Sequence, residues 1–198
     1  MQIEYTSKAS EVLKLLSVND ESGAVCIGNV RTAILPASGL SSMVNGIIRI
    51  FGETVAPSIV YEVGMEFGNA YYLEVKKMLD QGDPLSLTAP ELCKLLTFLG
   101  LGKFDFISGS LESPYIVLRL SNSPIVPDSK ITGCHLIRGI LAGLLTKIFR
   151  VELYVLEPRC ISRGDKYCEF EVWGSHTEPD TYTRGVNSDQ TATSPLKC

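Results

Sequence analysis

The chain has 198 residues, of which 45% are hydrophobic and 20% charged, and its formal net charge is −4. This composition is typical of one soluble domain with a full hydrophobic core, and the negative charge disfavours a nucleic-acid-binding surface. We find no apolar run of the roughly 20 residues that a membrane span needs, and no signal peptide. We therefore expect a cytoplasmic protein, in which cysteines are metal ligands or core thiols more often than disulfides.

Hydrophobic periodicity and turn residues predict alternating helices and strands along most of the chain. In chain order they are a helix at 7–17, strand-like sequence at 24–35, helices at 38–52 and 55–80, a helix from Thr88 to Gly100, strands at 103–109 and 114–121, a helix at 131–149, and strands at 151–157 and 166–173. We expect an N-terminal extension at 1–23, one domain at 24–173, and a disordered polar tail at 174–198.

Two local signals within the predicted helices have a physical cause. Thr88 can cap the helix that follows it, with Glu91 in the first turn. Gly64 and Gly68 are four residues apart and therefore share one helix face, which permits close approach to another helix or to a ligand. Tight packing inside the fold is the simpler explanation, because the membrane rule for GxxxG dimers does not apply to a soluble helix.

Four residues in the last third of the chain are the strongest candidates for chemistry. Cys134 begins an apolar helix face with three- and four-residue steps. Glu157 continues the apolar face of a strand, where a buried acid requires a partner. Cys168 lies on the apolar face of the next strand, and Cys160 follows the turn-forming Pro158. Antiparallel pairing of the two strands, with the helix on the same face, is expected to bring the four together.

Three thiolates and one carboxylate match the donor set of a tetrahedral zinc ion. Because protein groups fill all four positions, we expect a structural zinc site with no place for a catalytic water. The alternative is that the cysteines are small core residues, since free Cys is often buried. The loaded shell would carry about −2 on ideal ionisation, which four cationic residues nearby in sequence could offset: Arg138, Arg159, Arg163 and Lys166.

This part of the chain resembles the 4-vinyl reductase domain family. The resemblance is carried by GCHLIRGILAGLLTKIF, ELYVLEPRC and SRGDKYCEFEV. In this pattern a Cys opens a helix with RGxxAG, a strand ends in Glu-x-x-Cys, and Gly-Asp precedes a strand with Cys-x-Phe. The stretches NVRTAILPASGLSSMVNGIIRIFGE and YEVGMEFG fit the opening part of the domain, so the resemblance covers roughly residues 25–173.

The resemblance implies a mixed α/β (α+β) fold, in which an antiparallel sheet of about four to five strands packs against several helices. This fold is similar to that of Bet-type subunits of the TRAPP vesicle-tethering complex. In phenol-sensing activators a similar domain dimerises and binds zinc through three Cys and one Glu. Those positions correspond here to Cys134, Glu157, Cys160 and Cys168.

The family also implies a hydrophobic ligand pocket between the helices and the sheet. The candidate lining residues are Met43, Ile47, Phe51, Tyr61, Met65, Phe67, Tyr72, Phe104, Phe106 and Tyr115, although plain core is the simpler explanation for any one of them. The sensors hold the phenol hydroxyl with a His and a Trp upstream of the zinc site. This sequence has only His135, His176 and Trp173, so the phenol-specific pair is absent.

Three functions compete. The first is a non-catalytic binding or sensing domain for a hydrophobic or aromatic molecule, with structural zinc and a homodimeric assembly. The second is a dimeric adaptor similar to the TRAPP subunits. The third, suggested by the family name, is a reductase or accessory protein of tetrapyrrole metabolism. The sequence has no GxGxxG fingerprint after a strand and no P-loop. No His is well placed to activate Cys26 or Cys93.

Overall fold

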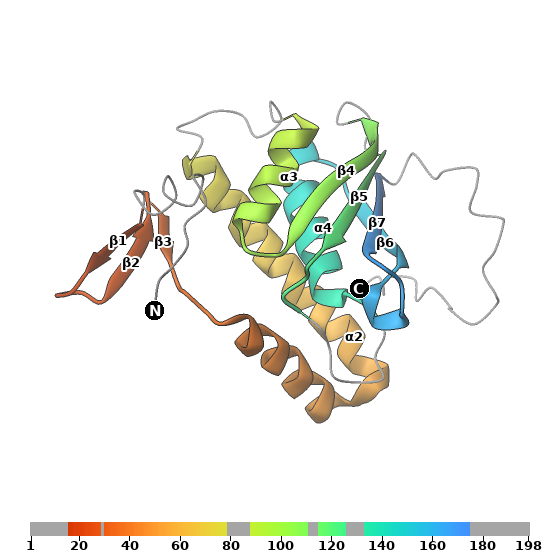
Figure 1. The fold of residues 1–198 in the computed structure, drawn as a ribbon, viewed down its shortest axis with the longest axis horizontal. Helices are drawn as coiled ribbons and strands as arrows, with labels where there is room; N and C mark the ends of the chain where they lie inside the picture. Colours follow the sequence, from red (N-terminus) through yellow and green to blue (C-terminus); the bar gives the residue numbers. More distant parts are fainter. Residues whose placement is uncertain (1–15, 29, 79–87, 111–114, 126–132, 175–198) are drawn as a thin grey trace, which may run out of the picture.

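A computed structural model describes residues 16–28, 30–78, 88–110, 115–125 and 133–174. Within this part the fold is a mixed α+β arrangement of two antiparallel sheets and three α-helices (Figure 1). The elements are β1 (Leu16–Asn19), β2 (Ala24–Ile27), β3 (Val30–Thr32), α2 (Ala37–Met78), α3 (Ala89–Phe98), β4 (Lys103–Ser110), β5 (Tyr115–Ser121), α4 (His135–Phe149), β6 (Leu153–Arg159), the 3₁₀ helix η2 (Ile161–Arg163) and β7 (Cys168–Gly174).

The predicted elements between residues 24 and 173 are confirmed in type and order. The expected helix at 7–17 lies outside the described residues except for Leu16 and Ser17, which belong to strand β1 instead. The polar tail beyond Gly174 also lies outside them. The predicted cap of α3 is confirmed, since the Thr88 N–H donates to the Glu91 carboxylate at 2.8 Å.

The larger sheet has strand order β4-β5-β7-β6, and all of its neighbouring strands are antiparallel. In β7 the side chains alternate, so that Cys168, Phe170 and Val172 are buried while Glu169 and Glu171 are partly exposed. Figure 1 shows α4 between this sheet and α2. A helix covered on both sides must be apolar nearly all round, and ten of the fifteen residues of α4 are buried.

Strand β4 differs from the alternation that its sequence predicts. Strict period two over 103–109 would place Phe104, Phe106 and Ser108 on one face. Phe104 and Phe106 do pair with alternate residues of β5, but the register then shifts so that Ser108 lies opposite Val117. The extra residue, Ile107, forms a β-bulge, which leaves Ser108 exposed rather than in line with the two phenylalanines.

Helix α2 consists of two helical segments, 37–51 and 53–78, as the sequence predicts. They meet at Gly52, whose φ of 77° and ψ of 166° lie outside the helical region. This backbone conformation is essentially restricted to glycine. By length and composition alone α2 could cross a membrane between Ala37 and Glu74, which the sequence analysis did not anticipate. Of its apolar window 22% is buried within the described residues, and Gly64 and Gly68, which are buried, pack against α4.

The second segment of α2 packs backbone to backbone against α4. A Cβ atom at Gly68 would lie 2.6 Å from the Leu144 nitrogen and 3.0 Å from the Gly143 Cα. A Cβ atom at Gly139 would lie 2.9 Å from the Gly64 Cα. Two small-residue pairs with four-residue spacing therefore interlock, one on each helix. The close approach predicted at Gly64 is confirmed, and its partner is a helix of the same chain.

Strands β1, β2 and β3 form a separate three-stranded sheet at the start of the described chain. In Figure 1 this sheet stands to one side of the helices and the larger sheet. Val30 is its one buried residue among those described. A three-stranded sheet needs a hydrophobic face or a packed helix for independent stability, so this sheet is not self-supporting.

Candidate metal centre and adjoining pocket

The fold brings the four candidate metal ligands into one buried cluster. Cys134 precedes the first residue of α4, Glu157 lies on the inward face of β6, Cys160 precedes η2, and Cys168 is the first residue of β7. All four are buried, and their ligand atoms lie within 4.8 Å of one another. Cys134 occupies the N-cap position with non-helical backbone angles, so it lies just before the helical face on which periodicity predicted it.

The sulfur separations match one shared cation. The Cys134 Sγ is 3.4 Å from the Cys168 Sγ and 3.7 Å from the Cys160 Sγ, and the last two are 3.8 Å apart. A disulfide requires an S–S distance of about 2.05 Å, so all three thiols are free in this structure. Sulfurs bound tetrahedrally to zinc at about 2.3 Å would be about 3.8 Å apart. The cluster can therefore hold a metal ion.

The carboxylate of Glu157 provides a test of fit that does not depend on the sulfurs. Its Oε2 accepts a hydrogen bond from the Cys134 backbone N–H at 2.7 Å, whereas its Oε1 is buried and has no hydrogen-bond partner. Burial raises the pKa of Glu157 to about 7. An orphaned carboxylate oxygen in an apolar interior is costly unless a cation compensates it, so this donor set fits a bound metal ion.

Hydrogen bonds around the sulfurs hold them in place. The Ser162 hydroxyl is 3.0 Å from the Cys160 Sγ and accepts the Gly133 N–H at 2.8 Å. The Ile161 N–H points to the Cys168 Sγ at 3.4 Å. The hydrogen bond between the Cys134 and Cys160 sulfurs is the main cause that lowers the pKa of Cys160. Outer groups of this kind orient metal ligands.

The expected positive charges act less directly than the sequence suggested. Arg163 donates to the Glu157 backbone carbonyl, and Arg138 donates to the Val155 carbonyl. Arg159 lies toward the other face of the sheet, 3.7 Å from the Glu169 carboxylate. The N-terminal end of α4, where Cys134 is the N-cap, contributes as well, because the helix dipole there favours anions. Sequence reasoning missed this contribution because it placed Cys134 inside the helix.

The ten residues expected to line a ligand pocket differ widely in their burial, and their role in binding stays a prediction. Phe104 is buried in the core, and Met43, Phe51 and Phe67 are exposed. Five others are partly buried and pack against the core: Ile47, Tyr61, Met65, Tyr72 and Phe106. Tyr115 is half-buried and lies opposite Trp173 on β7.

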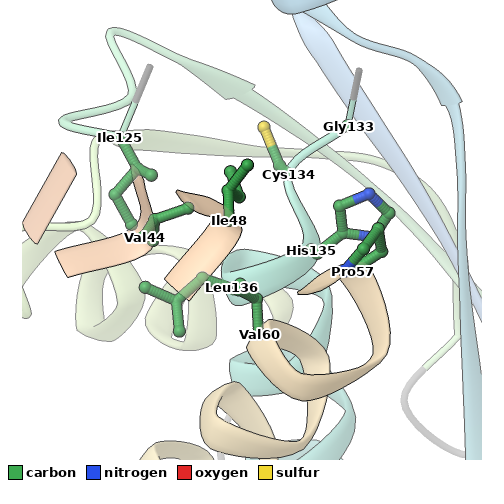
Figure 2. A pocket seen from close by; sticks show the side chains of 9 residues that line it. All are labelled: Val44, Ile48, Pro57, Val60, Ile125, Gly133, Cys134, His135 and Leu136. Carbon is green, nitrogen blue, oxygen red and sulfur yellow. The ribbon is translucent and has the colours of Figure 1, made fainter. Parts of the chain in front are cut away.

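A different pocket adjoins the metal cluster (Figure 2). It is lined by Val44, Ile48, Pro57, Val60, Ile125, Gly133, Cys134, His135 and Leu136. Its cavity volume is about 10 Å³, close to the minimum for one water molecule. None of the ten expected residues lines it. Spacing could not have revealed this site, because its walls come from both segments of α2, from Ile125 in the chain after β5, and from residues 133–136 at the start of α4.

Comparisons with known proteins agree with the resemblance seen in the sequence. The family model of the 4-vinyl reductase domain matches residues 116–173. The uncharacterized protein MJ0150 of Methanocaldococcus jannaschii is 43% identical over 115 residues, which are 58% of this chain and 63% of that protein. Uncharacterized protein MJ1460 of the same organism is 33% identical over 141 residues, 70% of this chain and 78% of that protein. The chain thus spans less than two thirds of the first relative.

Two solved structures share the fold at low sequence identity. The phenol-responsive sensory domain of the transcription activator PoxR, solved with phenol, has a TM-score of 0.67 and 13% identity, with 86% of this chain and 90% of that chain covered. A trafficking protein particle complex subunit 3 from Naegleria fowleri, covalently bound to palmitic acid, has a TM-score of 0.52 and 11% identity, with 70% and 94% covered. At these identities the likeness shows the fold alone.

Proposed function

The chain belongs to the 4-vinyl reductase domain family, and from this premise we propose that it is a non-catalytic domain that binds or senses a small hydrophobic molecule. In this proposal a zinc ion at Cys134, Glu157, Cys160 and Cys168 clamps α4 to β6 and β7. Two of the structural neighbours are described with bound hydrophobic molecules, phenol in one and palmitic acid in the other. These descriptions support a small hydrophobic molecule as the ligand class.

The observation that carries the proposal is the closed donor set of the metal centre. Three sulfurs and one carboxylate oxygen lie within 4.8 Å of one another, and all four residues are buried. Zinc in such a shell cross-links elements that are distant in sequence. It has no open position at which a water molecule could be activated. The three sulfurs select a thiophilic ion such as zinc over magnesium or calcium, which prefer oxygen ligands.

Metal and ligand content are measured on the same sample. Protein purified without added metal is analysed by inductively coupled plasma mass spectrometry, and we expect about one zinc per chain. Native and denaturing mass spectrometry of the same preparation tests for a co-purifying apolar molecule. A folded protein with a zinc content near zero would refute the clamp. A bound redox cofactor, or turnover of a vinyl-tetrapyrrole, would favour the enzymatic alternative.

A homodimeric adaptor is the second candidate, and exposed apolar side chains around α2 favour it. Ile34, Leu35, Ile50, Phe51 and Val55 are each more than half exposed. Contiguous exposed apolar surface marks interaction sites. Light scattering at several concentrations would measure the assembly. A stable dimer without any co-purifying ligand would favour the adaptor, and a monomer would exclude it. A cytoplasmic location, also part of the proposal, is testable by cell fractionation.

A further inference from the structure

The larger sheet has an outer face, which points away from the described helices. The residues of its inner face, such as Leu118 and Phe170, belong to the core that the helices share. Along β7 the outward residues are Glu169, Glu171 and Trp173, and all three are half-buried. They keep part of their surface in solvent, so a partner molecule can contact them.

Three aromatic side chains form a row across three strands of this outer face. Trp173 on β7 pairs with Tyr115 on β5 and with Tyr154 on β6. The ring centroids of Tyr154 and Trp173 are 6.5 Å apart, and Tyr154 is 43% exposed. Neighbouring strands are about 4.8 Å apart, so the row extends over about 10 Å. A sheet face of this width is too open to enclose a small free ion, but it can receive a side chain of another protein.

Glu171 lies next to this row and has no ion-pair partner among the described residues. Its neighbours on the adjacent strands are apolar, Val117 on one side and Leu156 on the other. Burial, and after it the charge of Glu169, raises the pKa of Glu171. Burial and the charge of Glu171 also raise the pKa of Tyr115, because the two side chains lie near each other. A cation placed here would stabilise the ionised carboxylate.

The other half of the same face contains an acid that already has such a cation. The guanidinium carbon of Arg119 lies 3.8 Å from the centroid of the Tyr167 ring. The Nη2 atom of Arg119 donates to the Glu169 carboxylate at 3.0 Å. A planar guanidinium can stack on a ring and pair with a carboxylate at the same time, which a lysine ammonium does less well.

The outward residues at positions 167 to 173 repeat this pattern in reverse order. Taken in steps of two, they are an aromatic residue, two acids and a second aromatic residue: Tyr167, Glu169, Glu171 and Trp173. Arg119 of β5 contacts the first aromatic residue and the first acid. Opposite the second acid and the second aromatic residue, β5 carries Val117 and Tyr115 instead. The second half of the pattern thus has the ring and the acid, and its strand neighbours supply no arginine.

We propose that this outer face docks a separate protein through an exposed arginine of that protein, whose guanidinium stacks on Trp173 and pairs with Glu171. Charge complementarity supports a basic partner, because the chain has a net charge of −4 and a second copy would carry the same charge. The inference depends neither on the metal nor on a small hydrophobic ligand, so its failure would leave the proposed function unchanged.

Fluorescence of Trp173 measures binding at this surface, because Trp173 is the only tryptophan of the chain. The full chain is titrated at constant ionic strength with a blocked pentapeptide that carries one arginine between glycines. A second peptide carries citrulline, which has nearly the same shape but no charge. We expect half-saturation at an about tenfold lower concentration of the arginine peptide, because citrulline loses the ion pair and the cation–π contact.

Glu171→Gln keeps the size of the side chain and removes its charge, so it should make the two peptides bind equally. Glu66→Gln removes one charge at an exposed position of α2 and should leave the preference for arginine unchanged. Thermal denaturation verifies that both variants are folded. Equal binding of the two peptides to the natural chain would overturn the inference, and so would an unchanged preference in Glu171→Gln.

Two further measurements test the kind of partner. Tetramethylammonium that binds as tightly as the arginine peptide would mean a site for small cations and would overturn a protein partner. Trp173 fluorescence that changes with the concentration of the chain alone, and no longer does so in Glu171→Gln, would mean that a second copy supplies the arginine. That result would overturn the separate protein. Weak binding of tetramethylammonium and no dependence on chain concentration are the expected results.

Discussion

Large apolar side chains are buried in the C-terminal region of the described chain, whereas several in the N-terminal region are exposed. In the C-terminal region Ile137, Leu141 and Phe170 have no exposed surface. In the N-terminal region Ile34 and Ile50 are 72% and 75% exposed. Burying such a side chain contributes about 1.5–3 kcal/mol, so the first region stabilises itself. The second region gains that stability only if something else covers it.

This difference in burial indicates separate roles for the two regions. The candidate metal cluster, α4 and the larger sheet form one packed unit, and the four cluster residues come from elements that are distant in sequence. The first segment of α2 is joined to that unit through Gly52, through the hydrogen bond from Ser41 to Pro124, and through the buried side chains of Val44 and Ile48. The pocket lies where the two regions meet, since its walls come from both.

The largest expected effect is loss of the cluster. Cys134→Ala should lower the free energy of unfolding by several kcal/mol, because metal binding in such sites is coupled to folding. Zinc content and denaturant unfolding measure both consequences. Cys26→Ala is the matched control, since Cys26 lies in the small sheet and is only half-buried. Equal unfolding free energies for the two variants would refute the clamp.

A smaller loss of stability is expected at the α2–α4 contact. Gly68→Ala places a Cβ atom 2.6 Å from a backbone nitrogen of α4, and overpacking of this kind costs about 1–3 kcal/mol. Gly46→Ala makes the same change in the first segment of α2, where a Cβ atom would have no neighbour within 4 Å. It should stabilise the helix by up to about 1 kcal/mol. Denaturant unfolding measures the change in unfolding free energy for each variant. A decrease for Gly68→Ala and an increase for Gly46→Ala would confirm the contrast between the two segments, and changes of the same sign would contradict it.

Loss of the hydroxyl beside the cluster should weaken metal binding without abolishing it. Ser162→Ala removes the contacts to the Cys160 sulfur and the Gly133 N–H without removing a metal ligand. Comparable outer groups change metal affinity by about 10–100-fold. Competition with a chelator measures the affinity. Ser38→Ala, at an exposed position in α2, is the control, and equal affinities would show that Ser162 does not orient the sulfur.

The sequence predicted those parts of the site that depend on local periodicity. The alternation of β6 placed Glu157 inward beside Val155, and the alternation of β7 did the same for Cys168. It also predicted close backbone approach at Gly68, because residues four apart share a helix face. These inferences need only the geometry of one element at a time.

What the sequence did not reveal depends on how several elements meet. The interlocking partner of Gly68 on α4 became visible only when the two helices were placed side by side. The bulge at Ile107 has no composition signal in its strand. The pocket draws on four segments, so the periodicity of no single element could predict it.

The smallest effect on stability, and the most direct test of the comparison, is expected at the exposed N-terminal surface. Ile50→Lys should leave the free energy of unfolding of a single chain within about 0.5 kcal/mol, because Ile50 is 75% exposed and packs little within its own chain. If a second copy covers this surface, the charge should weaken association strongly. Ser42→Lys adds the same charge at an exposed polar position of the same helical segment and should leave association intact. Light scattering that shows equal masses for both variants would mean that no second copy covers Ile50, and the exposed apolar residues would then need another partner.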